Sequence, residues 1–116
     1  MNILILEQSD VRCEQLVSVL EQYLSEAGQE ATFFRLRTQE VFRKTIHKDV
    51  DLAFIVVNSM ADMEAARQFH RLYNDIPFWV VSDSKEYAVE SFRFPAKGYL
   101  IRPIDSSSAA TVFQAV

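Results

Sequence analysis

The chain has 116 residues, a length that suits one domain with one hydrophobic core. Hydrophobic residues make up 49% and charged residues 24%, as in a soluble globular protein, and the net charge of -4 argues against a nucleic-acid surface. No apolar run is long enough to span a membrane, and the amino terminus lacks the basic region of a signal peptide. The sequence therefore predicts a cytoplasmic protein, and its single cysteine, Cys13, cannot form an internal disulfide.

Short apolar runs alternate with helical patterns along the chain. Strands are predicted over residues 2–6, 31–36, 51–58, 76–81 and 99–101. Helices are predicted over residues 10–27, 38–48, 61–73, 85–92 and 106–116. Ser9 is expected to cap the first helix and Gly28 to end it, with Cys13 on its buried face. Arg35 and Arg37 favour an edge position for the second strand.

The stretch 51–58, DLAFIVVN, is predicted to be the central strand. Its apolar run from Leu52 to Val57 has no polar interruption, whereas a strand with one wet face would alternate. Repeated strand–helix alternation predicts an α/β fold, a flavodoxin-like three-layer sandwich around a five-stranded parallel sheet of order 2-1-3-4-5. No glycine-rich loop follows the first strand, which argues against a dinucleotide or P-loop site.

The carboxyl third of the chain carries the most specific pattern. It contains Asp75-Ile76-Pro77, then Ser82, then EYAVESF at 86–92 and GYLIRPID at 98–105. With the DLAFIVV strand and Ala66-Arg67, these motifs resemble the receiver domain of two-component response regulators, especially the receivers attached to LytTR-type DNA-binding domains. The resemblance spans almost the whole chain and implies the CheY-like form of the fold. It also implies that residues 1–116 are one receiver-like domain, the amino-terminal part of a longer regulator.

Receivers carry five chemical groups at the carboxyl edge of the sheet. Two acidic residues hold Mg²⁺, an Asp accepts the phosphoryl group, and a hydroxyl and a Lys bind the phosphoryl oxygens. The matching positions here, in chain order, are Glu7, Gln8, Val56, Ser82 and Arg102. Tyr99 occupies the position of the aromatic switch residue.

The departures from this pattern predict a degenerate phosphorylation pocket. Val56 has no oxygen to phosphorylate, and a register shifted by two residues offers Asn58, which is still no carboxylate. Gln8 removes one metal-binding charge, and Arg102 is not interchangeable with Lys as a phosphate ligand. We therefore expect no metal site, no cofactor and no catalytic residue. Glu7 and Arg102 either pair across the vacated pocket or both face water.

The predicted function is that of a pseudo-receiver, a signalling or dimerisation module that works without phosphorylation and is not an enzyme. By resemblance to the LytTR branch, the intact protein would regulate transcription and bind DNA only through a domain outside this chain. Expected partners are a second copy or a regulatory protein, with no membrane and no small-molecule substrate. The alternatives are a stand-alone protein-binding adaptor and a Mg²⁺-dependent phospho-acceptor that uses Asp10 or Asp62.

The candidate interface lies on the face that carries the output of receivers, built by the fourth helix, fifth strand and fifth helix. Val89 and Phe94 are expected to remain outside the core there, among residues of both charges. The alternative for Phe94 is that it folds under the turn before Gly98. The sequence predicts self-association through this face, with Tyr99 held by packing rather than by Ser82.

Overall fold

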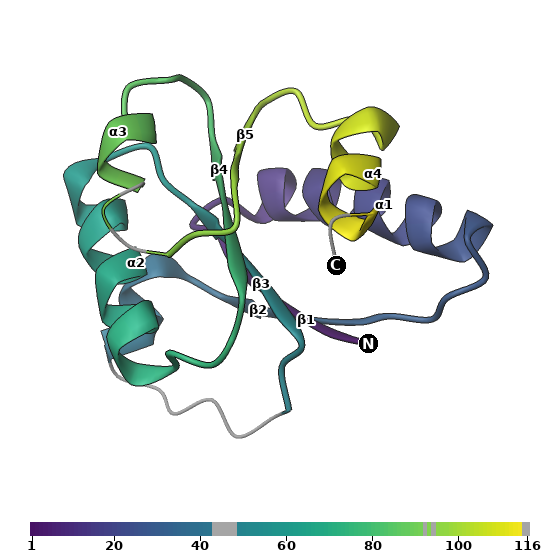
Figure 1. Ribbon diagram of the computed structural model, residues 1–116, viewed down its shortest axis with the longest axis horizontal. Helices are drawn as coiled ribbons and strands as arrows, with labels where there is room; N and C mark the ends of the chain where they lie inside the picture. The colour runs from purple at the N-terminus through teal and green to yellow at the C-terminus, as the bar shows by residue number, and fades with distance from the viewer. Residues whose placement is uncertain (43–48, 92, 94, 115–116) are drawn as a thin grey trace.

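The fold is seen in a computed structural model that describes residues 1–42, 49–91, 93 and 95–114 (Figure 1). Among these residues, five parallel strands form one sheet of order β2-β1-β3-β4-β5. The strands are β1 (Asn2–Leu6), β2 (Thr32–Leu36), β3 (Leu52–Val56), β4 (Phe78–Ser82) and β5 (Tyr99–Ile101). The predicted sheet and its strand order are confirmed, including the edge position of β2.

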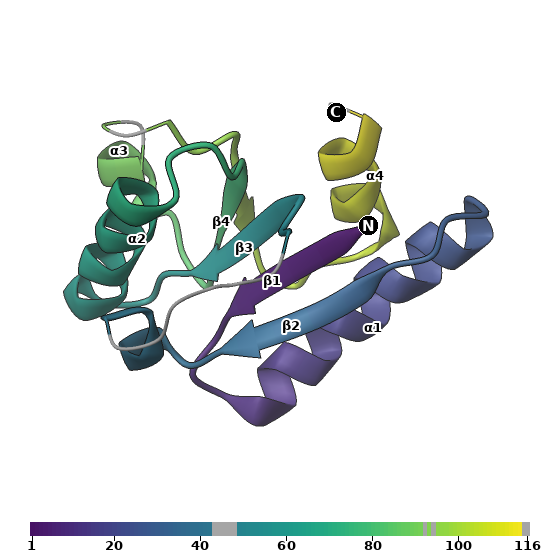
Figure 2. The ribbon, with the colours of Figure 1, turned by 90° about the horizontal axis from the view of Figure 1, so that it is seen from below.

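Helices cover both faces of the sheet. They are α1 (Asp10–Glu26), the 3-10 helix η1 (Thr38–Phe42), α2 (Met60–Leu72), α3 (Ala88–Ser91) and α4 (Ser106–Gln114). Helices α1 and α4 pack together on one face, and η1, α2 and α3 lie on the other (Figures 1 and 2). The three-layer sandwich predicted from the sequence is thus confirmed.

Strand β3 is buried on both faces, as its uninterrupted apolar sequence predicted. All five of its residues are buried. Phe54 and Val56 belong to the core beneath α1 and α4, whereas Ala53 and Ile55 belong to the core beneath α2. The alternation of side chains in a strand therefore supplies one residue in turn to each of the two cores.

Local signals in the sequence set the ends of α1. The Ser9 side chain accepts a hydrogen bond from the Arg12 backbone N–H at 3.3 Å, which caps the first turn. Gly28 follows the helix with a φ of 74°, a left-handed conformation that glycine adopts without a steric penalty. Cys13 lies on the buried face of α1, and burial raises the pKa of its thiol. Cys13 is therefore a core residue, as expected.

Two helices differ from the prediction within the described residues. The helix expected over 85–92 is reduced to α3, because the residues before it form turns. There the Ser84 hydroxyl accepts a hydrogen bond from the Glu86 N–H at 3.3 Å, a local bond that competes with helix formation. The helix expected over 38–48 is the 3-10 helix η1 as far as 42, and residues 43–48 lie outside the described part. No helix in the described ranges is both long and apolar enough to cross a membrane.

Candidate functional site

The candidate site is the carboxyl edge of the sheet, where the ends of four parallel neighbouring strands meet. Glu7 follows β1, Asn58 follows β3, Ser82 ends β4, and Arg102 follows β5. The Arg102 backbone N–H donates to the Ser82 carbonyl at 2.9 Å, which continues the pairing of β4 with β5 up to this edge. Open parallel sheets place their functional groups here because the strand ends leave a crevice between the two helical layers.

Glu7 and Arg102 form an ion pair across this edge. Arg102 Nη2 lies 3.3 Å from Glu7 Oε1, and the two side chains are only 14% and 5% exposed, respectively. The other carboxylate oxygen of Glu7 accepts from the Gln8 backbone N–H at 3.1 Å. Of the two arrangements open from the sequence, pairing is the one observed. The pair is largely buried, so its removal has larger consequences than that of an exposed pair.

A second acidic residue, Asp83, extends this pair into a chain of alternating charges. Asp83 Oδ1 lies 3.7 Å from Arg102 Nη1, beyond hydrogen-bond distance. Both Asp83 oxygens accept from Arg12 Nη1, at 2.7 and 2.5 Å, and this hydrogen bonding raises the pKa of Arg12. Arg102 Nη1 is itself buried and donates no hydrogen bond within the described residues. The sequence analysis missed Arg12 and Asp83, although Asp83 directly follows Ser82 at the end of β4.

The hydroxyl of Ser82 is bound by the amide of Asn58. Ser82 Oγ donates to Asn58 Oδ1 at 3.0 Å, and the Asp83 backbone N–H donates to the same oxygen at 2.8 Å. The backbone N–H of Asn58 in turn donates to Asp62 Oδ2 at 2.8 Å. Ser82 is fully buried, so this contact fixes the one hydroxyl that the resemblance assigned to the pocket.

Val56, the position matched to the phospho-acceptor, lies in the core beneath the edge. Its exposed fraction is 3%, and it packs in the apolar cluster shared with α1. The side chain that contacts Ser82 is Asn58, the residue offered by the register shifted by two positions. Because side chains point alternately to the two faces of a strand, residues 56 and 58 belong to the same face, and Asn58 lies just beyond the end of β3.

Gln8 is directed to the neighbouring 3-10 helix. Its side-chain oxygen accepts from the Thr38 backbone N–H at 3.1 Å, and its amide nitrogen donates to Gln39 Oε1 at 3.2 Å. These bonds connect the segment after β1 to the start of η1. Gln8 therefore acts as a structural link at the position that the resemblance assigned to a metal ligand.

The two acidic residues of the alternative phospho-acceptor reading already have partners. Asp10 pairs with Arg35 and Arg37, and the hydrogen bond from Arg35 lowers the pKa of Asp10. Asp62 accepts from the Asn58 backbone N–H and also lies in the first turn of α2. Within the described ranges, no group of three or more His, Cys, Asp or Glu residues converges as a metal site would require.

Tyr99 and the candidate interface lie beside this edge. The Tyr99 hydroxyl donates to the Ser84 carbonyl at 2.6 Å, and its ring packs with the core on the α2 side of the sheet. Val89, in α3, is 69% exposed. Phe94, the other candidate interface residue, lies outside the described residues, as does Phe92.

Comparison with known proteins relates the chain to receiver domains through its fold. No family model matches the sequence, and no curated protein matches it. A receiver domain protein of Methanospirillum hungatei JF-1 is 20% identical with a TM-score of 0.72, covering 98% of this chain and 90% of its own. A response regulator of Thermotoga maritima is 16% identical with a TM-score of 0.75, and the match covers 98% of this chain and 94% of that chain. A protein assigned to pilus assembly in Burkholderia thailandensis E264 is 19% identical with a TM-score of 0.79, and the match covers 99% of this chain and 96% of that chain.

These structures establish the class of fold. The strand order, the parallel sheet and the two helical layers of this chain are those of CheY-like receiver domains. The shared fold does not by itself assign the chemistry, because one fold supports many functions and the residues of the site determine which.

Proposed function

We propose that this chain is a pseudo-receiver, a receiver-like domain of a two-component-type response regulator that signals without being phosphorylated. By the sequence resemblance, we propose further that the intact regulator is of the LytTR type and controls transcription through a separate DNA-binding domain. The receiver fold supports the first part of the proposal. The residues at the carboxyl edge of the sheet support the absence of phosphotransfer.

The observation that carries the proposal is the largely buried Glu7–Arg102 pair. A receiver holds Mg²⁺ with acidic side chains and the phosphoryl group with a cation, and Mg²⁺ requires several oxygen ligands in octahedral geometry. Here the one acidic side chain kept at the end of β1 binds the one cation kept at the end of β5. The neighbouring Asn58 amide occupies Ser82 and offers no nucleophilic oxygen of the kind a carboxylate has.

Incubation with a small phosphodonor tests this proposal. The full chain would be treated with acetyl phosphate and Mg²⁺ and then examined by intact mass spectrometry, with a receiver that retains its acceptor Asp run in parallel. We expect no acid-labile phosphoryl adduct on this chain, because the carboxylates described at the edge, Glu7 and Asp83, are both paired with arginines. An adduct would contradict the proposal and support the Mg²⁺-dependent alternative. The variants Asp10→Asn and Asp62→Asn would then identify the residue that carries the adduct.

The output surface of the proposed module is the face built by α3, β5 and α4. Val89 is exposed on α3, and residues of both charges, Glu90 and Arg93 among them, lie near it in the sequence and pair with each other at 3.6 Å. An apolar residue surrounded by charged ones is typical of a contact surface. The Tyr99 hydroxyl donates a hydrogen bond to the Ser84 carbonyl and not to Ser82, which supports a face that stays in one conformation.

Self-association through this face can be measured by sedimentation velocity. We expect the parent to dimerise and the variant Val89→Glu to shift towards monomer, because a charge would be buried in the contact. Val11→Glu is the matched control: Val11 is also a valine, is 64% exposed compared with 69% for Val89, and lies on α1 outside the face. A parent that stays monomeric at hundreds of micromolar would remove self-association and favour the stand-alone adaptor. A dimer that is equally sensitive to both changes would contradict the choice of face.

A further inference from the structure

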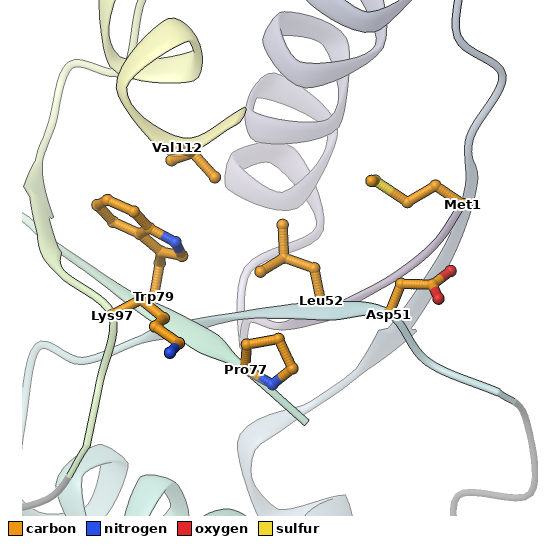
Figure 3. Close-up of a pocket in the computed structure, with 7 residues that line it drawn as sticks. All are labelled: Met1, Asp51, Leu52, Pro77, Trp79, Lys97 and Val112. Atoms are coloured by element: carbon orange, nitrogen blue, oxygen red, sulfur yellow. The ribbon is translucent and has the colours of Figure 1, made fainter. Parts of the chain in front are cut away.

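A cavity of about 710 Å³ opens at the amino edge of the sheet, opposite the edge that holds Glu7 and Arg102 (Figure 3). It lies between the starts of β3, β4 and β5 and the helix α4. The residues that line it are Met1, Asp51, Leu52, Pro77, Trp79, Lys97 and Val112. Its size falls within the range of pockets that enclose small organic ligands, about 300–1,000 Å³.

The walls of the cavity are mostly apolar. Leu52 and Val112 are buried core residues, and both side chains point into the space that Trp79 faces (Figure 3). Pro77 lies beneath them, at the start of β4. Walls of this kind favour the apolar part of a ligand, because each contact removes apolar surface from water.

The indole of Trp79 presents an unpaired hydrogen-bond donor to the cavity. Its six-membered ring lies against Gly98, where an added Cβ would come within 2.3 Å of Trp79 Cζ3. The indole nitrogen is consequently on the other side of the ring, facing Leu52 (Figure 3). Trp79 is only 7% exposed, yet its N–H donates to no acceptor among the described residues. Arg102 Nη1 is the fully buried unpaired side-chain nitrogen among the described residues, so the Trp79 N–H is open to the cavity, where an acceptor atom of a ligand can bind it.

The charged side chain beside Trp79 at the rim of the cavity is the cation Lys97 (Figure 3). Lys97 is exposed and forms no ion pair within the described part of the chain. Asp51 is the acidic residue of the lining, and its Oδ2 accepts from the Asn2 backbone N–H at 2.7 Å. Its carboxylate also lies at the Met1 end of the cavity, away from Trp79 (Figure 3). The free cation and the free N–H donor both suit an anionic acceptor.

We propose that this cavity binds a small organic anion with an apolar body, namely an aliphatic or aromatic carboxylate. The apolar body would lie between Trp79, Leu52 and Val112. The carboxylate would pair with Lys97, and the Trp79 N–H would donate to it. The sequence predicted no small-molecule substrate, and the ligand proposed here is bound rather than converted. The site is at the other edge of the sheet from the proposed pseudo-receiver pocket and does not depend on that function.

Trp79 is the only tryptophan of the chain, so its fluorescence reports directly on the cavity. The full chain would be titrated with octanoate and, separately, with 1-octanol, which has the same number of carbons but no charge. We expect a saturable change of Trp79 emission with octanoate. In the variant Lys97→Met, the affinity for octanoate should fall by about three- to fivefold, the effect of losing one solvent-exposed ion pair, while the affinity for 1-octanol should stay the same.

A cavity-filling variant locates the binding. Val112→Phe should abolish the response to both compounds, with folding checked by circular dichroism. If that variant does not fold, NMR shifts of the parent take its place and should concentrate at Leu52, Trp79 and Val112. The proposal is overturned by a parent that shows no saturable response, by binding that survives Val112→Phe or maps elsewhere, or by octanoate affinity that Lys97→Met leaves unchanged.

Discussion

Replacing Arg102 with methionine tests the buried ion pair that closes the carboxyl edge. The change keeps most of the side-chain volume and removes the charge, so the Glu7 carboxylate, only 5% exposed, would remain buried without its cation. Removing one partner of a buried pair generally destabilises a protein by about 3–5 kcal/mol. Because this pair lies at the edge of the sheet rather than in its centre, we expect the lower end of that range, about 3 kcal/mol.

The reverse change, Glu7→Gln, should destabilise the protein less. Arg102 would keep Asp83 as a second anion, 3.7 Å from its Nη1, so we expect a loss of about 2 kcal/mol. The double variant Glu7→Gln, Arg102→Met removes both charges and should also lose only about 2 kcal/mol, since no uncompensated charge stays buried. The two changes are therefore expected to be strongly coupled, by about 3 kcal/mol.

Urea denaturation of the parent, both single variants and the double variant gives this coupling energy directly. The matched control is Arg12→Met, which breaks the Arg12–Asp83 pair between side chains that are 45% and 43% exposed. That loss should stay below about 1 kcal/mol. An Arg102→Met variant that loses no more than Arg12→Met, or single losses that simply add, would refute the view that the pair is buried and closes the edge.

Three further changes test other parts of the structure. Val56→Asp should lower the free energy of unfolding by about 3 kcal/mol or more, because it places a carboxylate in the core. Asn58→Asp keeps an oxygen at the strand end and should lower it by only about 1 kcal/mol. Equal losses of the two variants in thermal melts would contradict the buried position of Val56. Asp10→Asn should destabilise the protein near neutral pH. The pKa of Asp10 is lowered in the folded state, so its contribution is present above the ordinary value of 3.8 and is lost as the pH falls below it. The difference from the parent should therefore vanish in acid, and a difference that persists there would argue against the ionic origin. Gly98→Ala should displace the Trp79 ring, lower the melting temperature and shift the tryptophan emission, and unchanged emission would contradict the contact between them.

The sequence alone determined the elements whose signals are local. The run from Leu52 to Val57 predicted the central strand because burial on both faces requires apolar residues at successive positions. Ser9 and Gly28 predicted the ends of α1 because capping depends on a few neighbouring residues. Strand–helix alternation then left few possible topologies, and the predicted strand order was the one observed.

Only the tertiary structure decided how the side chains at the two edges of the sheet are partnered. Glu7 and Arg102 are 95 positions apart in the chain, and whether they pair or face water depends on the strands that bring them together and on the burial around them. The choice between Val56 and Asn58 at the pocket depends on where β3 ends relative to β4, which fixes the residue that meets Ser82. The cavity beside Trp79 likewise exists because five distant segments of the chain converge there. Side-chain environments of this kind are set by neighbours remote in sequence, so patterns read along the chain cannot specify them.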